Sequence, residues 1–153
     1  MAIADPFVAI QAVEAEGRSY VRVDAVGNPP EGGLAAMLDA ARVSSAVGSP
    51  PAPLLLDLCG LWSFAIPDDT QWLREVLVPA LAAAGVSRAA VVVNGNVHQW
   101  ALRPWEAQLK AGTPSVLCLP CSWHVDEFFR SGLRREDTEG EWRAQAEAWL
   151  AGA

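Results

Sequence analysis

The sequence lacks the short motifs that mark several large classes of enzyme. It contains no G-x-G-x-x-G and no G-x-x-x-x-G-K-[ST], the phosphate-binding patterns of nucleotide-dependent enzymes. It also contains no G-x-S-x-G and no H-E-x-x-H, and only two histidines are available to any hydrolytic triad. These absences argue against a nucleotide-dependent or hydrolytic enzyme.

Long apolar runs and a basic leader are lacking as well. The longest nearly apolar stretch, residues 72–86, is interrupted by Arg74, Glu75 and Pro79 and is shorter than the ~20 residues that span a bilayer. Residues 1–7 carry an acid and no basic stretch before an apolar run, so we expect no secretory signal. Three cysteines without framework spacing favour a reducing compartment. We therefore expect a cytoplasmic protein with no membrane span.

Basic charge is scarce. Eleven Lys and Arg stand against eighteen Asp and Glu, which gives a formal net charge of −7 at pH 7. The electrostatic field of such a negatively charged chain repels phosphates, so we expect no nucleic-acid partner. The 153 residues are 52% apolar and 19% charged, a globular composition, and they fit one domain spanning residues 1–153.

Hydrophobic periodicity predicts an α/β fold. Polar and apolar residues alternate over residues 19–26, which together with residues 7–13 predicts an antiparallel hairpin whose second strand is half-buried. Three further apolar runs predict strands buried on both faces: residues 53–59, 89–93 and 115–119. The predicted helices are residues 34–48, 68–84, 96–109, 123–129 and 138–150. This order argues for a mixed sheet, the hairpin joined to three parallel strands, covered by helices.

Capping residues and prolines set the expected helix limits. Two pairs have capping-box spacing: Asp68 with Gln71, and Thr138 with Glu141. Gly85 is expected to end the second helix, and Pro79 to kink it. Pro104 is expected to break the third. The last helix is predicted to bury four residues: Trp142, Ala146, Trp149 and Leu150.

Five segments, spread over residues 18–150, carry a family resemblance through their order and spacing. They are Tyr20-Val21-Arg22-Val23, Leu54-Leu55-Leu56-Asp57-Leu58-Cys59-Gly60-Leu61, Leu77-Val78-Pro79-Ala80-Leu81, Ala89-Ala90-Val91-Val92-Val93 and Ala148-Trp149-Leu150. Together they resemble the STAS-like proteins labelled SpoIIAA-like, small bacterial α/β proteins related to anti-sigma-factor antagonists. The resemblance implies a non-catalytic module that binds partners or small ligands.

The same resemblance implies a phosphoacceptor near the start of the second helix. The sequence departs from the family there, because it lacks the expected Asp-Ser-Ser-Gly. Thr70 is the hydroxyl nearest to that position. Its neighbours Asp68 and Asp69 would repel the added charge of about −1.5 to −2, so an ordinary first-turn residue is the alternative interpretation.

Cys118 and Cys121 form a C-x-x-C at a strand-to-helix junction that resembles the thioredoxin arrangement. A helix N-terminus lowers the pKa of a thiol, which favours a reactive Cys121. The motif follows the last strand, whereas the thioredoxin pattern places it after an early one. The alternative is two small apolar residues at a turn. Further side chains of the kind that bind zinc are present in Cys59, His98 and His124. Their spacing matches no zinc module, so we predict no metal. We also predict no cofactor.

The carboxyl ends of the three parallel strands share one edge of the sheet, where open α/β sheets bind ligands. The residues that follow or end these strands are the candidate ligand-binding set: Asp57, Cys59, Gly60, Asn94, Gly95 and Asn96. Asp57 is expected to bond to neighbouring loop amides. This edge is the predicted pocket for a small apolar ligand.

Seven tryptophans are more than one small core accommodates. Trp62, in a predicted loop, and Trp105, after Pro104, are the candidates for exposed aromatic surface at an interface. The alternative is that each is half-buried over a sheet edge.

Three hypotheses for function follow. The leading one is a non-catalytic STAS-like regulatory or interaction module that binds a protein partner or itself. The alternatives are a carrier of a small apolar or lipid-like ligand, and a C-x-x-C thiol redox protein.

Overall fold

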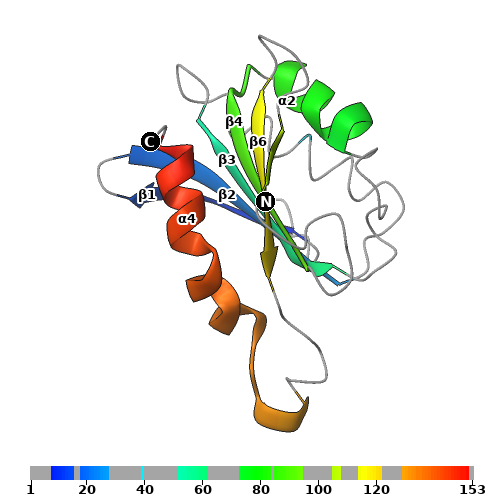
Figure 1. Ribbon diagram of the computed structural model, residues 1–153, viewed down its shortest axis with the longest axis vertical. Helices are drawn as coiled ribbons and strands as arrows, with labels where there is room; N and C mark the ends of the chain where they lie inside the picture. The colour runs from blue at the N-terminus through cyan, green and yellow to red at the C-terminus, as the bar shows by residue number, and fades with distance from the viewer. Residues whose placement is uncertain are drawn as a thin grey trace, which may run out of the picture.

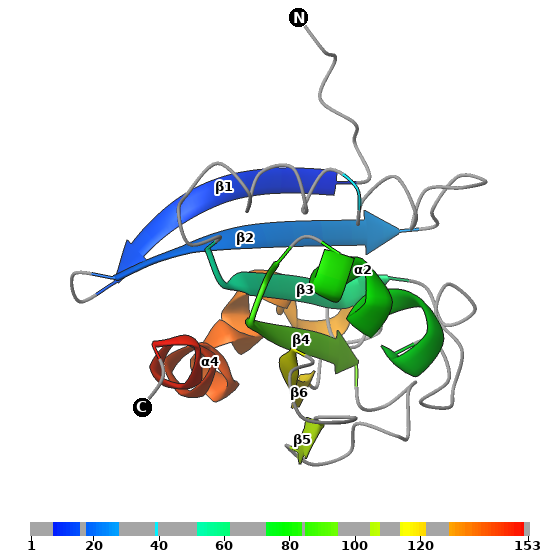
Figure 2. The same cartoon turned by 90° about the horizontal axis from the view of Figure 1, so that it is seen from above.

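A six-stranded mixed sheet forms the centre of the computed structural model, which describes residues 8–15, 18–27, 39, 52–61, 73–83, 85–94, 105–107, 114–121 and 129–151. The strands are β1 (Val8–Ala15), β2 (Arg18–Gly27), β3 (Leu54–Leu61), β4 (Arg88–Asn94), β5 (Trp105–Ala107) and β6 (Ser115–Cys121). Their order across the sheet is β1-β2-β3-β4-β6-β5 (Figures 1 and 2).

The strand directions confirm the predicted fold class. β1 and β2 pair antiparallel. The next three pairs across the sheet are parallel: β2 with β3, β3 with β4, and β4 with β6. The hairpin is therefore joined to three parallel strands, as the sequence predicts. Val91–Val93 and Leu54–Leu56 are buried on both faces, which is why those runs carry no polar residue.

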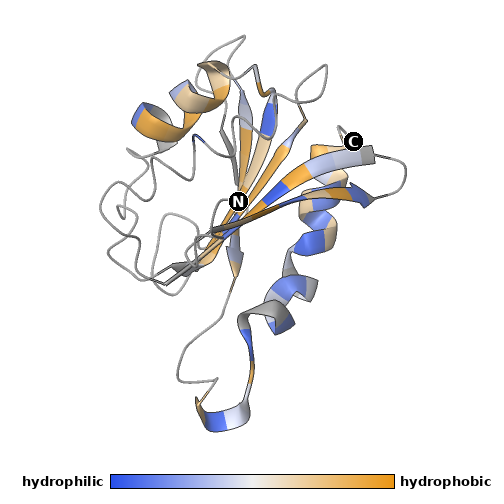
Figure 3. Ribbon diagram, turned by 180° about the vertical axis from the view of Figure 1, so that it is seen from behind, coloured by the Kyte–Doolittle hydropathy of each residue, from blue (hydrophilic) through white to orange (hydrophobic). Residues whose placement is uncertain are grey.

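Helical segments cover the two faces of the sheet and divide the core into two clusters. Leu54, Leu56 and Leu58 pack with Val78 and Leu81 on one face, which η1 (Leu73–Leu77) and α2 (Val78–Ala83) cover. The alternate residues of the strands face η3 (Arg135–Glu141) and α4 (Arg143–Leu150) on the other side (Figure 1). In Figure 3 apolar residues concentrate on the strands, while η3 and α4 carry many polar residues.

Four residues from the C-terminal segment close this second cluster, as predicted. They are Trp142, Ala146, Trp149 and Leu150, all buried. The part of the chain described in the structure contains no helix long and apolar enough to cross a membrane.

The second predicted helix divides at its proline. Residues 73–77 form a π-helical turn, and α2 begins at Val78, directly before Pro79. Because proline has no N–H to donate, the α-helical bonding pattern is interrupted in the preceding turn. The Asp68–Gln71 capping box lies outside the described residues.

Gly85 ends α2 in the way the sequence predicts. Its φ is 76°, a left-handed conformation that favours glycine. The Gly85 N–H donates to the Ala82 carbonyl (3.1 Å), and the Val86 N–H donates to the Leu81 carbonyl (3.0 Å). This pair of bonds is the Schellman motif, and the buried side chains of Leu81 and Val86 accompany it in the same cluster.

Two predicted boundaries near the C-terminal half are wrong. Residues 105–107, predicted as part of a helix, form β5, antiparallel to β6. The backbone of β6 offers hydrogen-bond partners to these residues on the side that β4 does not occupy. Thr138 does not cap a helix; it lies buried inside η3, and Trp142 stands at the N-cap of α4.

Other predicted helices fall largely outside the described residues. Of residues 34–48 only Asp39 is described, and it is helical. Of residues 123–129 only Phe129 is described; it is helical and 78% exposed.

We expect Gly85→Ala to lower the free energy of unfolding by about 1–2 kcal/mol, because a Cβ disfavours the left-handed conformation. Urea unfolding measures this. Gly140→Ala is the matched control, since a Cβ at Gly140 would have no atom within 4 Å. Equal losses in the two variants would contradict a conformational role for Gly85.

Candidate functional site

The carboxyl ends of the parallel strands meet at one edge of the sheet, where the candidate ligand-binding residues were predicted. Asp57 lies in the middle of β3, Cys59 and Gly60 lie near its end, and all three are buried. Asn94 ends β4 and is paired with Cys121, the last residue of β6. The structure thus brings these strand ends together, while Gly95 and Asn96 lie outside the described residues.

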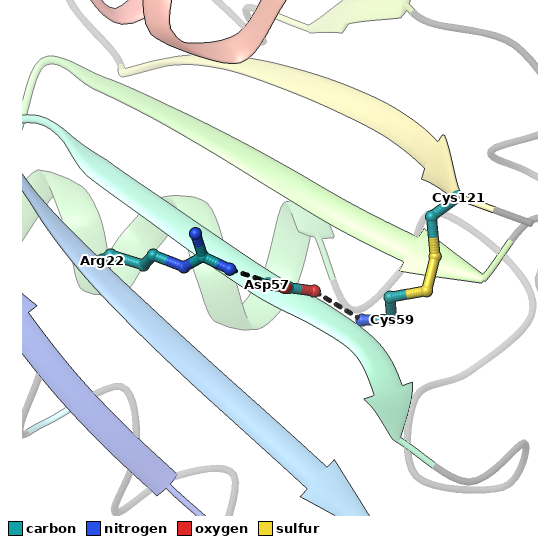
Figure 4. Close-up of a disulfide and its surroundings, with 4 residues drawn as sticks. All are labelled: Arg22, Asp57, Cys59 and Cys121. Carbon is teal, nitrogen blue, oxygen red and sulfur yellow. Dashed lines mark hydrogen bonds and ion pairs between the residues drawn. A yellow bond between two sulfur atoms is a disulfide. The ribbon is translucent and has the colours of Figure 1, made fainter. Parts of the chain in front are cut away.

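A disulfide joins Cys59 to Cys121 at this edge, with 6.3 Å between the Cα atoms (Figure 4). That separation lies within the range that a disulfide spans. The C-x-x-C hypothesis pairs Cys121 with Cys118, whereas the structure joins Cys121 to Cys59 and leaves Cys118 outside the bond, as the alternative interpretation of two residues at a turn allows. Residues three apart on a strand point to opposite faces, so Cys118 packs in the α2 cluster and Cys121 in the α4 cluster.

Cys118 is therefore a free thiol buried on the opposite face of the sheet. Burial raises its pKa to about 12, so it stays protonated and unreactive near neutral pH. Strand alternation was the available signal: Leu117, Leu119 and Cys121 share a face, and Cys118 does not.

Beside the disulfide lies a buried ion-pair network that the sequence analysis missed. Arg22 on β2 is 5% exposed. Its Nη2 contacts the Asp57 carboxylate at 3.2 Å and also donates to Glu139 of η3. Its Nε donates to Asp24 at 3.1 Å. The Arg22 guanidinium therefore links β2, β3 and η3.

The electrostatics of this cluster favour charged side chains despite their burial. Burial alone would lower the pKa of Arg22, but the bonds to Glu139 and Asp24 outweigh it and raise that pKa. Burial alone would raise the pKa of Glu139, but Arg22 and Arg143 together lower it. The ring of Trp142 lies 5.7 Å from the Arg22 guanidinium carbon, in cation–π range.

The network continues along α4 through exposed and half-buried groups. Arg143 Nη1 donates to Glu139 at 3.1 Å and its Nε lies 3.7 Å from Glu147. The Tyr20 hydroxyl donates to Glu147 at 2.9 Å. Burial, followed by this hydrogen bond, raises the pKa of Tyr20 to about 12.

Asp57 connects the network to the disulfide. One carboxylate oxygen, Oδ2, lies against Arg22, and the other, Oδ1, accepts the backbone N–H of Cys59 at 3.1 Å (Figure 4). The predicted bonding of Asp57 to a nearby amide is therefore present, but the amide belongs to the same strand. Both oxygens of this acid are engaged in structural bonds.

Three other candidate residues stay predictions. Thr70, the candidate phosphoacceptor, and Trp62, a candidate interface residue, lie outside the described residues. Trp105 is on β5 at the border of the sheet, and its side chain is outside the described part. Within the described ranges no group of three His, Cys, Asp or Glu side chains is placed to hold a metal ion.

We expect Asp57→Asn to lower the free energy of unfolding by about 3 kcal/mol, because it leaves part of a buried cation uncompensated. Urea unfolding at neutral pH measures this. Arg143→Gln is the control: its side chain is 43% exposed, and its loss should stay below about 1 kcal/mol. Similar losses in both variants would argue against a buried ion pair at Asp57.

The lowered pKa of Glu139 makes part of the stability depend on pH. A carboxylate with a depressed folded-state pKa stabilises the fold above its unfolded value, ~4.3, and this contribution disappears as the pH falls through the folded value. We expect wild type to exceed Glu139→Gln in unfolding free energy at neutral pH, and the gap to close in acid below about pH 4. Unfolding curves across that range test this; a gap that persists unchanged in acid refutes it.

No protein-family model matches the chain, and no curated protein matches it. A comparison with solved structures finds an uncharacterized protein of the DUF3478 family with a SpoIIAA-like fold, from Shewanella loihica PV-4. The two share 22% sequence identity over 65% of this chain and 78% of that chain, with a TM-score of 0.38.

Proposed function

We propose that the protein is a non-catalytic regulatory or interaction module of the STAS-like kind, and that the partner is a second copy of the same chain. The observation that carries this proposal is the outer edge of β1, with which no described strand pairs. β1 is the first strand in the sheet order, and within the described residues its strand neighbour is β2 alone (Figure 2). Backbone groups of alternate β1 residues therefore point away from the sheet, where another strand can bond to them.

The composition of β1 suits pairing with a further strand. Soluble proteins usually blunt an open edge with lysine, proline or a very short strand. β1 has eight residues, no lysine and no proline, and Glu14 is its one charged residue. Ala9, Gln11 and Ala12 are exposed. β5, at the opposite border, has only three residues.

Charge and symmetry favour a second copy in an antiparallel arrangement. Two identical β1 strands related by a twofold axis perpendicular to the sheet would run in opposite directions. Glu14 of one strand would then lie toward the Val8 end of the other, so the two carboxylates stay apart. In a parallel arrangement the same two charges would face one another.

The carboxyl edge of the sheet supports a binding role more than a chemical one. Asp57 is held by Arg22 and the Cys59 amide, Cys59 and Cys121 are bonded to each other, and Cys118 is buried. The buried carboxylate at this edge is thus engaged in structural bonds, and the free thiol of Cys118 lies on the other face of the sheet. The acidic net charge supports a module without a nucleic-acid partner.

We expect the wild-type chain to form dimers in sedimentation velocity, and Ala12→Lys to weaken dimerisation by about tenfold or more, because it places a cation on each open edge. Ala82→Lys is the matched control, because Ala82 is exposed on α2 and this substitution adds the same positive charge as Ala12→Lys. Salt should strengthen wild-type association, because each chain carries a net charge of −7.

A wild-type chain that stays monomeric into the millimolar range would overturn the second copy as partner. Equal weakening by Ala12→Lys and Ala82→Lys would show that net charge, and not the β1 edge, governs association.

A further inference from the structure

We infer that Cys59 and Cys121 form a reversible thiol–disulfide site that takes a dithiol reductant, and that its oxidation state controls closure of the carboxyl edge of the sheet. This inference is independent of the β1 edge and goes beyond the proposed function. It rests on the backbone ladders around the two cysteines and on the contacts of Cys59.

The disulfide joins strands that are not neighbours. β4 lies between β3 and β6, and two strand spacings amount to ~9.5 Å. The Cα atoms of Cys59 and Cys121 are nevertheless 6.3 Å apart. The ends of β3 and β6 therefore converge across the end of β4 (Figure 4).

The pairing between β3 and β4 ends two residues before the disulfide-bonded Cys59. The pairing of β3 with β4 ends at Asp57 and Val92, whereas the pairing of β4 with β6 continues to Asn94 and Cys121. After Asp57, β3 is paired with β2 instead, with Gly60 opposite Val26 beyond an irregularity in the ladder. Among the described strand pairings, none ties this last part of β3 to β4 or β6. The disulfide supplies that tie.

Movement of the β3 end is coupled to the buried ion pairs. The Cys59 N–H donates to Asp57, Asp57 contacts Arg22, and Arg22 contacts Glu139 of η3. Reducing the disulfide allows Cys59 to move relative to β6. The hydrogen bond from the Cys59 amide to Asp57 is the first contact that this movement changes. The oxidation state is thereby linked to the packing of the C-terminal segment.

The chemistry is thiol–disulfide exchange. Cys59 and Cys121 are each 1% exposed, so exchange requires a local opening of the end of β3, which no described strand pairing ties to β4 or β6. A thiolate of the reductant then attacks one sulfur of the Cys59–Cys121 bond, forms a mixed disulfide and expels the other cysteine as a thiolate, which takes up a proton. The second thiol of the reductant then displaces the remaining cysteine. Two electrons and two protons pass to the protein, and the reductant leaves as its own disulfide.

The third cysteine does not interfere with this exchange. Cys118 lies on the opposite face of the sheet and is buried, so it reaches neither sulfur of the bond. Exchange is confined to one pair. Within a reducing compartment, disulfides that do form are typically transient or redox-sensing.

The test uses the full chain and dithiothreitol as the probe. After oxidation, alkylation in denaturant should label one cysteine, Cys118, and after reduction all three. The reduced protein should stay folded and reoxidise. Hydrogen exchange of backbone amides in residues 58–61 should rise by about tenfold or more on reduction, while β1 and β2 up to Asp24 keep their protection.

Two variants separate the site from general effects. Cys118→Ala should keep the same redox transition and the same change in exchange. A Cys59→Ala, Cys121→Ala double variant should show the fast exchange at residues 58–61 under oxidising and reducing conditions alike.

Three results would overturn the inference. The first is three labelled cysteines after oxidation, because the bond then does not form. The second is loss of protection throughout β1 and β2 on reduction, because the bond then holds the whole fold. The third is unchanged exchange at residues 58–61, because the edge then does not respond.

Discussion

One buried guanidinium holds three separate parts of this chain together. Arg22 comes from β2, and its carboxylate partners come from β2, from β3 and from η3. Removing a charge from water is costly, and such a cluster is stable only when most donors find acceptors. The planar fork of arginine reaches several carboxylates at once, which a lysine ammonium does less well. This geometry fixes η3 against the sheet, and α4 follows directly from η3.

The position of α4 in turn decides what the second core cluster contains. Trp142 lies beside Arg22 and is buried among Tyr20, Leu55 and the residues of β6. The disulfide belongs to the same cluster, since Cys59 and Cys121 face α4. The ion pairs and the covalent bond therefore stabilise one side of the sheet, while the α2 side depends on apolar packing and on the Gly85 turn.

The two borders of the sheet differ in a way that bears on function. β1 is long and nearly uncharged along its length, and β5 is short. Among the described residues of the carboxyl edge, Asp57 is tied into the fold, so we favour backbone bonds at β1 as the route to the proposed partner. The proposed pairing at β1 and the proposed thiol exchange at the carboxyl edge would use different atoms of the same sheet.

Local patterns of the sequence predict much of the architecture. The leucines at 54–56 and the alanines and valines at 89–93 specify strands buried on both faces, because no polar residue interrupts them. Gly85 specifies a helix end, because a left-handed residue without a Cβ is needed there. These features depend on neighbours close in the chain, and the predicted hairpin and parallel strands follow from them.

Other features depend on contacts between distant residues, which no local pattern contains. The alternation of residues 19–26 predicted a half-buried strand, yet Tyr20 and Arg22 are buried because η3 and α4 cover that face. The spacing of Cys118 and Cys121 suggested a pair, but strand alternation separates them and the sheet brings Cys59 to Cys121 across 62 residues. Residues 105–107 became a strand because β6 had an open side. Local periodicity thus determined five of the six strands, β5 being the exception. Tertiary packing decided which charged groups and which sulfurs lie together, because that depends on which faces of the sheet are covered.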